Sequence, residues 1–196
     1  TSLLLAGDVN PRDVQRQLSR WTASGRIQQL RRGVYILGEP FRRVSPHPFL
    51  VANQLVAGSY VSCQSALAYY NLIPEYVPVV TSVTTARPMR WDTPIGAFRY
   101  RHIKCELFWG YRRVELGGGQ EAFVASAEKA LLDLLYLEPR ADERSYLREL
   151  RLQNLGQLNM AELSRKAERT GSAKLQRAIA IVPELAQTEE LEYVAL

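Results

Sequence analysis

The chain has 196 residues, of which 46% are hydrophobic and 23% are charged, a composition typical of a globular protein with one large domain or two smaller ones. No apolar run approaches the roughly 20 residues of a membrane helix, and the N-terminus lacks the apolar core of a signal peptide. Two cysteines and two histidines do not indicate a disulfide scaffold and are a poor set of metal ligands. These features predict a cytoplasmic protein with free thiols and no membrane segment.

The net charge of +5 is confined to the start of the chain. Residues 1–43 hold eight arginines against three acidic residues, whereas the rest of the chain holds 17 basic and 17 acidic side chains. Such an asymmetry is typical of a surface that binds a polyanion, most often nucleic acid. The alternative is a basic terminus that is merely solvated.

The first predicted elements are two helices. A short apolar helix is expected to end at Gly7, and a second helix is expected between Asn10 and Gly25. Asn10 is a good N-cap, Pro11 suits the first helical position, and Gly25 suits the residue just past the C-terminus.

The second of these helices is predicted to have an apolar and a polar face. Val14, Leu18 and Trp21 fall on one face at i, i+4, i+7 spacing. The rest of the surface carries side chains that can bond bases and phosphates. We interpret five of them as DNA contacts: Arg12, Gln15, Arg16, Ser19 and Arg20.

Ile27–Leu30 and Val34–Leu37 are predicted to form a hairpin whose turn contains Gly33. A tight helix pair with an arginine-bearing second helix, followed by a basic hairpin, is the order of a winged helix-turn-helix. In that fold the second helix enters the major groove, and the wing would carry Arg31 and Arg32 to neighbouring phosphates or to the minor groove. A winged helix normally has a further helix ahead of this pair. Since the chain begins without a methionine, we expect the DNA-binding module to be incomplete in this sequence.

The composition changes after Pro40. Residues 41–48 are predicted to be a proline-rich linker, which gives a winged helix-turn-helix domain at 1–40 and a mixed α/β domain at 44–196, and an α+β fold class overall. The elements expected in the second domain are helices at 49–57 and 66–70 (the latter capped by Ser62), strands at 77–87 and 98–103, a hairpin of 107–116 with 121–126, an amphipathic helix at 126–137 and a helical part from about 140 to 185.

No catalytic constellation is evident. Ser126 and Lys129 match the S-x-x-K pattern of penicillin-binding-type nucleophiles, but a serine that caps a helix explains the pair better. His47 and His102 have no cysteine or carboxylate at ligand spacing, and His102 is expected to be partly buried in a strand. The carboxylates are scattered, without the clusters that hold magnesium in nucleases. We therefore predict a non-enzyme with no catalytic residue, metal or cofactor.

The stretch 98–113, "FRYRHIKCELFWGYRR", has two interpretations. Interleaved aromatic and basic side chains can stack on and neutralise single-stranded nucleic acid. The same alternation is typical of a strand with one buried face, which we favour.

Taken in order, these parts resemble the AbiEi-type antitoxins. The resemblance covers roughly residues 1–140 and is carried by four stretches: "GRIQQLRRGVYIL" at 25–37, "YVSCQSALAYYNLIPE" at 60–75, "VVTSVTT" at 79–85 and "FVASAEKALLDLLYL" at 123–137. The family pairs with toxins in bacterial toxin–antitoxin and phage abortive-infection systems.

The resemblance implies a two-domain repressor. Its winged helix would bind double-stranded DNA at inverted repeats in its own promoter, and its second domain would assist repression and counter a toxin similar to a nucleotidyltransferase. The DNA contacts that it implies are Arg12, Arg16, Ser19, Arg31 and Arg32. The family also includes solitary regulators. A winged helix that binds a protein partner, or an enzyme that acts on nucleic acid, are alternatives of other classes.

Overall fold

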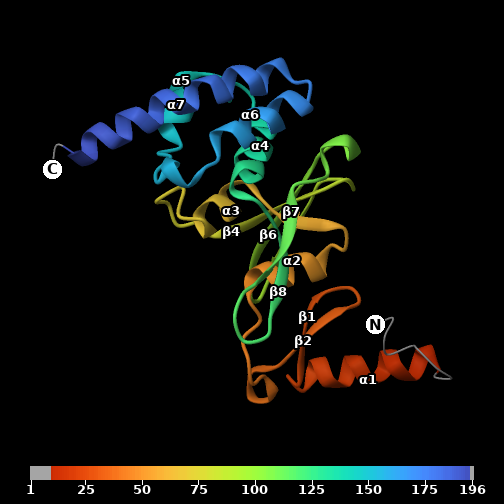
Figure 1. Ribbon diagram of the computed structural model, residues 1–196. Coiled ribbons are helices and arrows are strands. Elements are labelled where there is room, and N and C mark those ends of the chain that lie inside the picture. The colour runs from red at the N-terminus through yellow and green to blue at the C-terminus, as the bar shows by residue number, and fades with distance from the viewer. Residues whose placement is uncertain (1–9, 195–196) are drawn as a thin grey trace.

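The structure is a computed structural model that describes residues 10–194, with side chains described as far as residue 185. The short helix expected to end at Gly7 lies outside the described residues. Within that range the chain forms an α+β fold with two β-sheets (Figure 1). The α-helices are α1 (Pro11–Ala23), α2 (Pro48–Leu55), α3 (Cys63–Tyr69), α4 (Ala127–Leu137), α5 (Arg144–Glu149), α6 (Met160–Arg169) and α7 (Ala173–Val194). The strands are β1 (Ile27–Arg31), β2 (Val34–Leu37), β3 (Ser59–Val61), β4 (Val79–Thr84), β5 (Met89–Thr93), β6 (Gly96–His102), β7 (Tyr111–Glu115) and β8 (Glu121–Ala125). Three short 3-10 helices are η2 (Glu39–Phe41), η3 (Cys105–Leu107) and η4 (Leu155–Gln157).

α1 begins and ends where the sequence predicts. The Asn10 side chain accepts a hydrogen bond from the backbone N–H of Arg12 at 3.0 Å, which satisfies one of the free donors at the start of a helix. Pro11 occupies the first turn, where its missing N–H is not needed. Gly25, just past the helix, takes the left-handed backbone conformation with φ 69° that glycine tolerates best.

β1 and β2 form the predicted antiparallel hairpin, closed by Arg32 and Gly33. Gly33 has φ 84°, a turn conformation that glycine adopts without steric cost. The pairing register shifts between Gln29 and Arg31, so β1 contains an irregularity of the β-bulge type. Because of it, Ile27 and Leu30 are both buried although they are three residues apart.

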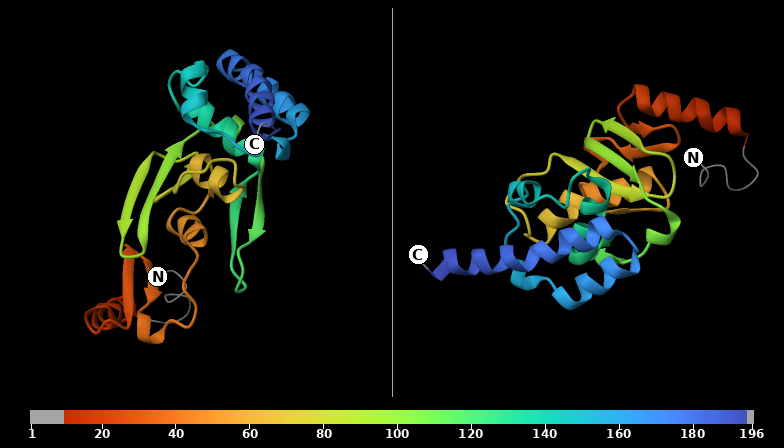
Figure 2. Two further views of the ribbon diagram at one scale, coloured as in Figure 1. Left: turned by 90° about the vertical axis from the view of Figure 1, so that its left-hand side faces the viewer. Right: turned by 90° about the horizontal axis from the view of Figure 1, so that it is seen from above.

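The hairpin joins the N-terminal helix to the rest of the protein. Leu30 belongs to the main hydrophobic core, and Val34 and Ile36 pack against that core. β1 also contacts β5 of the large sheet. Viewed from above, the hairpin lies between α1 and the β5–β6 pair (Figure 2).

The predicted linker at 41–48 is held in place by a side chain that lies more than 70 residues farther along the chain. The backbone N–H of His47 donates to Oε1 of Gln120 at 2.6 Å, and Nε2 of Gln120 donates to the carbonyl of Ser45 at 3.1 Å. Gln120 follows the Gly117–Gly119 turn between β7 and β8. The segment therefore has a fixed path, which its proline-rich composition did not indicate.

The large sheet has six strands in the order β5-β6-β4-β3-β8-β7. β4 pairs with β6 in parallel, and β3 pairs with β8 in parallel, whereas the other pairs are antiparallel. The β5–β6 and β7–β8 pairs extend as two arms on either side of α2, and the helices from α4 onward gather at the other end (Figure 2).

α4 is the central helix of that end. It contacts α3, β8, α6 and α7. The sequence predicts an amphipathic helix, but every residue from Glu128 to Leu135 is buried, the charged ones included. The prediction of a polar outer face was wrong because α6 and α7 cover the side expected to meet solvent.

Other differences are local. The sequence predicted neither β3, which has three residues, nor β5, and the region before β7 contains η3 instead of strand. Ser62 stands at the N-cap position of α3 but makes no capping bond, because its hydroxyl donates to Asp133 at 2.7 Å. His102 is exposed rather than partly buried, since it lies at the last residue of β6.

Candidate nucleic-acid interface

The polar side chains predicted on α1 all face solvent. Of the apolar face, Leu18 is buried and Val14 and Trp21 are half-buried. The exposed set is Arg12, Gln15, Arg16, Ser19 and Arg20. The helix thus presents a continuous surface that is rich in arginine, while its apolar side faces inward.

Few acidic groups neutralise this surface. Arg16 lies 3.4 Å from Asp13, an exposed pair one turn apart that contributes little free energy. Within the described part of the chain, Arg12 and Arg20 form no ion pair. The hydroxyl of Ser19 donates to the carbonyl of Gln15 at 3.0 Å and keeps its lone pairs free to accept.

Arg31 and Arg32, adjacent at the hairpin tip, are not equivalent. Arg32 is exposed, and its guanidinium has no partner among the described residues. Arg31 is half-buried, and its guanidinium carbon lies 5.9 Å from the centre of the Trp91 ring on β5. The structure therefore brings Arg32 to the surface with α1 and places Arg31 against β5 of the large sheet.

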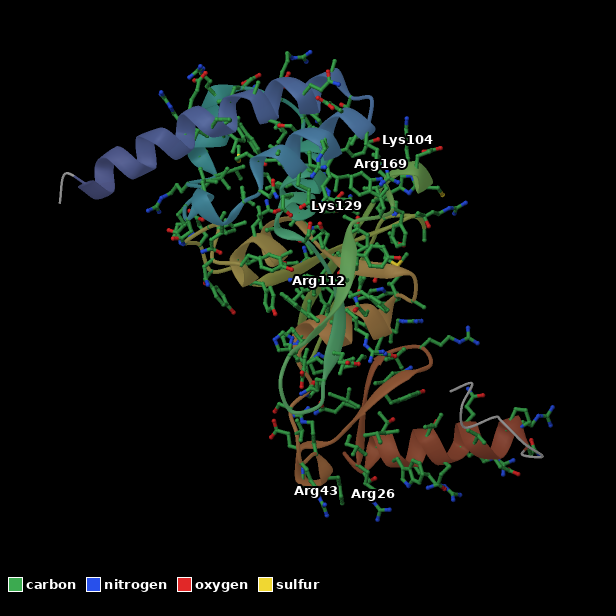
Figure 3. The ribbon with its side chains drawn as sticks, in the orientation of Figure 1. Arg26, Arg43, Lys104, Arg112, Lys129 and Arg169 are labelled. Atoms are coloured by element: carbon green, nitrogen blue, oxygen red, sulfur yellow. The ribbon has the colours of Figure 1, made fainter. Side chains whose placement is uncertain are left out.

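Two further arginines extend the basic surface and were not among the predicted contacts. Arg26 and Arg43 are both exposed and project at the end of the molecule that holds α1 (Figure 3). Arg42, next to Arg43, does not belong to this surface. It pairs with Glu39 at 3.4 Å, and its side chain is largely covered. The charge excess of residues 1–43 was the signal that pointed to Arg26 and Arg43.

A close backbone contact fixes the hairpin relative to α1. The N–H of Gly38 donates to the carbonyl of Arg26 at 2.8 Å, and the N–H of Arg26 donates to the carbonyl of Trp21 at 2.9 Å. A Cβ atom on Gly38 would lie 1.9 Å from the carbonyl oxygen of Gly25. Only glycine fits there, so the crossing point of the helix and the hairpin is sterically defined.

A second group of polar residues lies far from α1, inside the helical end. Lys129 and Asp133, one turn apart on α4, form an ion pair whose two side chains are each 3% exposed. The hydroxyls of Tyr60 and Ser62 donate to the Asp133 carboxylate at 3.0 and 2.7 Å. Trp109 covers the pair, since Lys129 Nζ lies 5.0 Å from its ring centre.

Burial governs the ionisation of this cluster. It raises the pKa of Asp133 despite the opposing effect of Lys129, and it raises the pKa of the Tyr60 hydroxyl. It also raises the pKa of the Cys63 thiol, which is fully buried. A thiol with a raised pKa and no access to solvent is a poor nucleophile. The sequence signal was a Lys and an Asp four residues apart within an apolar helix.

The predicted role of Ser126 as a helix cap is confirmed. Its Oγ accepts the N–H of Lys129 at 3.3 Å and donates to Glu128 at 3.0 Å. Lys166 Nζ approaches the same oxygen at 3.0 Å, but it is held by Glu162 at 2.6 Å and by Glu128 at 3.6 Å.

The predicted identity of stretch 98–113 as a strand with a buried face is confirmed for β6. Phe98 and Tyr100 are buried in the core, and the Tyr100 hydroxyl donates to the carbonyl of Ala52 at 2.7 Å. Arg101 pairs with Glu138. Farther along, Arg169 of α6 lies 4.5 Å from the ring centre of Trp109, on the surface near Lys104 (Figure 3).

Metal sites, disulfides and membrane spans were also sought among the described residues. No three His, Cys, Asp or Glu side chains in that range gather where they would hold a metal ion. Cys63 and Cys105 form no disulfide. No helix in the described range combines the length and apolar character needed to cross a bilayer.

Comparison with known proteins adds no family. No model of a known protein family matches the chain, and a search of curated proteins finds no relative. The resemblance to AbiEi-type antitoxins therefore stays a prediction from the sequence.

Proposed function

We propose that this protein is a sequence-specific DNA-binding transcriptional repressor and the antitoxin of a bacterial toxin–antitoxin system. α1 would enter the major groove of double-stranded DNA at inverted repeats in the promoter of its own operon, with the β1–β2 hairpin as the wing of a winged helix-turn-helix. The second domain would counter a toxin similar to a nucleotidyltransferase.

The observation that supports DNA binding is the exposed arginine surface of α1. A helix of 13 residues is about 20 Å long, which suits a major groove, and its outward side chains have the donors that read guanine and phosphate. Arg12 and Arg20 are free of ion pairs within the described residues, so no intramolecular partner has to be displaced when a phosphate binds. Arg32 at the hairpin tip is free in the same sense.

DNA binding is tested by fluorescence anisotropy with a labelled duplex from upstream of the reading frame and a scrambled duplex as competitor. Arg12→Ala and Arg16→Ala should each weaken binding, and each lost phosphate contact should lower the slope of log affinity against log salt by about one. Arg113→Ala is the matched control, because Arg113 is an exposed arginine on β7 that pairs with Glu121 at 2.9 Å. Equal effects of all three variants would refute the role of α1.

The antitoxin role is supported by the resemblance alone and has its own test. The gene beside this one is expressed in cells with and without this chain, and growth is followed. Growth arrest by the neighbour, relieved by this chain, supports the role. A neighbour without toxicity, or arrest that this chain does not relieve, would leave a solitary regulator.

A second candidate, a protein-interaction module, is favoured by one feature of the surface. An open hollow of about 290 Å³ is lined by Phe49, Tyr69 and Tyr76, and Tyr76 is 89% exposed. Exposed aromatic side chains beside a hollow are typical anchors of protein interfaces. This function predicts no salt-dependent DNA binding and a stable complex with a co-expressed partner, which Tyr76→Ala would weaken.

A further inference from the structure

Arg31, at the base of the hairpin turn, packs against the edge strand of the large sheet. Its guanidinium lies over the Trp91 ring at 5.9 Å, within the range of a cation–π interaction. β1 and β5 touch at this point, and the hairpin is bounded by α1 on its other side (Figure 2). The contact joins the arginine-rich N-terminal region to the edge of the six-stranded sheet.

The polar atoms of this contact are poorly satisfied. Arg31 Nε and Trp91 Nε1 are both buried and have no hydrogen-bond partner within the described residues. Arg31 Nη1 donates to the carbonyl of Arg32 at 3.3 Å, so the guanidinium folds back on its own turn. No carboxylate in residues 10–185 pairs with Arg31. A half-buried cation without a counter-ion, beside a second unpaired donor, is a weakly held arrangement.

We propose that Arg31 packs on Trp91 only in the free protein, and that a DNA phosphate displaces the guanidinium from the ring when the protein binds DNA. This inference rests on the proposed DNA-binding function. Arg32 makes the first contact of the hairpin because it is already exposed, and Arg31 makes the second. A phosphate supplies the acceptor that Nε lacks and the negative charge that the guanidinium lacks. Departure of Arg31 also exposes Nε1 of Trp91 to water.

Trp91 therefore competes with DNA for Arg31, and its removal should raise affinity. Tryptophan is the strongest aromatic partner for a cation, and phenylalanine keeps the apolar packing while weakening the attraction. Trp91→Phe also removes one unpaired donor, so it should fold well. We expect its affinity for the upstream duplex to rise about two- to five-fold, the change that a cation–π contact at a partly exposed site supports.

A spectroscopic experiment tests the displacement in the unaltered chain. Fluorotryptophan labels Trp21, Trp91 and Trp109, the three tryptophans of the sequence, and Trp91→Phe identifies the signal of Trp91 in fluorine NMR. Saturation with the upstream duplex should shift the Trp91 signal and increase its exposure to a paramagnetic solvent agent. Trp109 in the helical end should stay unchanged. A Trp91 signal that keeps its position and protection while DNA is bound would overturn the proposal.

Affinity measurements test the same displacement independently. Arg31→Ala should weaken binding and lower the salt slope by about one, as Arg32→Ala does. Arg90→Gln, on the same strand as Trp91 but paired with Asp92 at 2.9 Å, is the control and should have little effect. If Arg32→Ala lowers the slope and Arg31→Ala does not, Arg31 stays on Trp91 and the proposal is wrong.

Failure of this inference differs from failure of DNA binding. If no duplex binds in a salt-dependent manner, the proposed function fails and the inference with it. If the duplex binds with the α1 dependence expected above, but Trp91→Phe has unchanged affinity and Trp91 keeps its signal, only the inference fails.

Discussion

Replacement of Gly38 by alanine isolates the contact that sets the hairpin against α1. Gly38 has φ −62° and ψ 156°, an extended conformation that alanine adopts without strain. The cost of the substitution thus comes from the added methyl group alone. That group would lie 1.9 Å from the Gly25 carbonyl oxygen, 3.1 Å from the Gly25 carbonyl carbon and 3.3 Å from the Arg26 carbonyl carbon.

All three neighbours are backbone atoms, so no flexible side chain can move aside. Relief requires the backbones of residues 25–26 and 38 to separate by more than an ångström, which strains or breaks the 2.8 Å bond from the Gly38 N–H to Arg26. Overpacking of this kind costs about 1–3 kcal/mol, and a lost backbone hydrogen bond adds about 1 kcal/mol. Alanine also lowers the conformational entropy of the unfolded chain, which stabilises the folded state by only about 0.4–1 kcal/mol. We expect Gly38→Ala to lower the free energy of unfolding by about 1–3 kcal/mol.

Urea titration followed by circular dichroism measures this loss. Gly156→Ala is the matched control, because a Cβ at Gly156 meets no atom within 4 Å. Gly38→Ala should also weaken binding to the upstream duplex and lower the salt slope, because a misplaced hairpin loses its phosphate contacts although no charge is removed. Equal midpoints for Gly38→Ala and Gly156→Ala would show that the steric argument is wrong.

Three further changes test contacts in the rest of the chain, beyond the hairpin. Asp133→Asn leaves the Lys129 ammonium buried without a counter-ion, so the free energy of unfolding should fall by about 3–5 kcal/mol, and the double variant Lys129→Met/Asp133→Leu should lose less in the same urea titration. Burial acts to raise the pKa of Glu128, but bonds from backbone N–H groups and Ser126 outweigh it and lower the pKa below its ordinary 4.5. The ionised form therefore stabilises the fold, fully above about pH 4.5 and less as the pH falls through the lowered pKa, so the melting temperatures of wild type and Glu128→Gln should converge in acid. Gln120→Ala removes both hydrogen bonds to the 41–48 segment, and hydrogen exchange at the His47 amide should accelerate while α4 keeps its protection.

The parts of the fold that the sequence predicts are those with local causes. α1 has a capping asparagine, a proline in the first turn and an apolar stripe within one segment, and its bounds were predicted closely. β4 is a run of β-branched residues in the middle of the sheet. β3 and β5 were missed because three residues give no periodicity, and because β5 gains its regular structure from pairing with β6.

The burial of α4 illustrates a cause that lies outside the local sequence. Lys129 and Asp133 indicate a solvent-exposed face when the helix is considered alone. In the structure, Tyr60 and Ser62 from the β3 region supply hydroxyls to Asp133, and Trp109 covers Lys129. Polar residues on a buried helix are satisfied by partners distant in sequence, so a pattern within one helix cannot reveal them.

The doubled arginine of the hairpin shows the same limit at the candidate site. From the sequence, Arg31 and Arg32 are predicted to be equivalent DNA contacts, because both are basic and both lie near Gly33. Their difference arises because Arg31 is the last residue of β1 and Arg32 the first of the turn, and because Trp91 lies where β5 meets β1. Had both arginines been exposed, single alanine substitutions would be expected to have similar effects on DNA affinity at every salt concentration. With Arg31 held by Trp91, its contribution to the proposed DNA binding would depend on a residue of the large sheet, and a substitution in that sheet would change the affinity of the β1–β2 hairpin for DNA without touching the DNA.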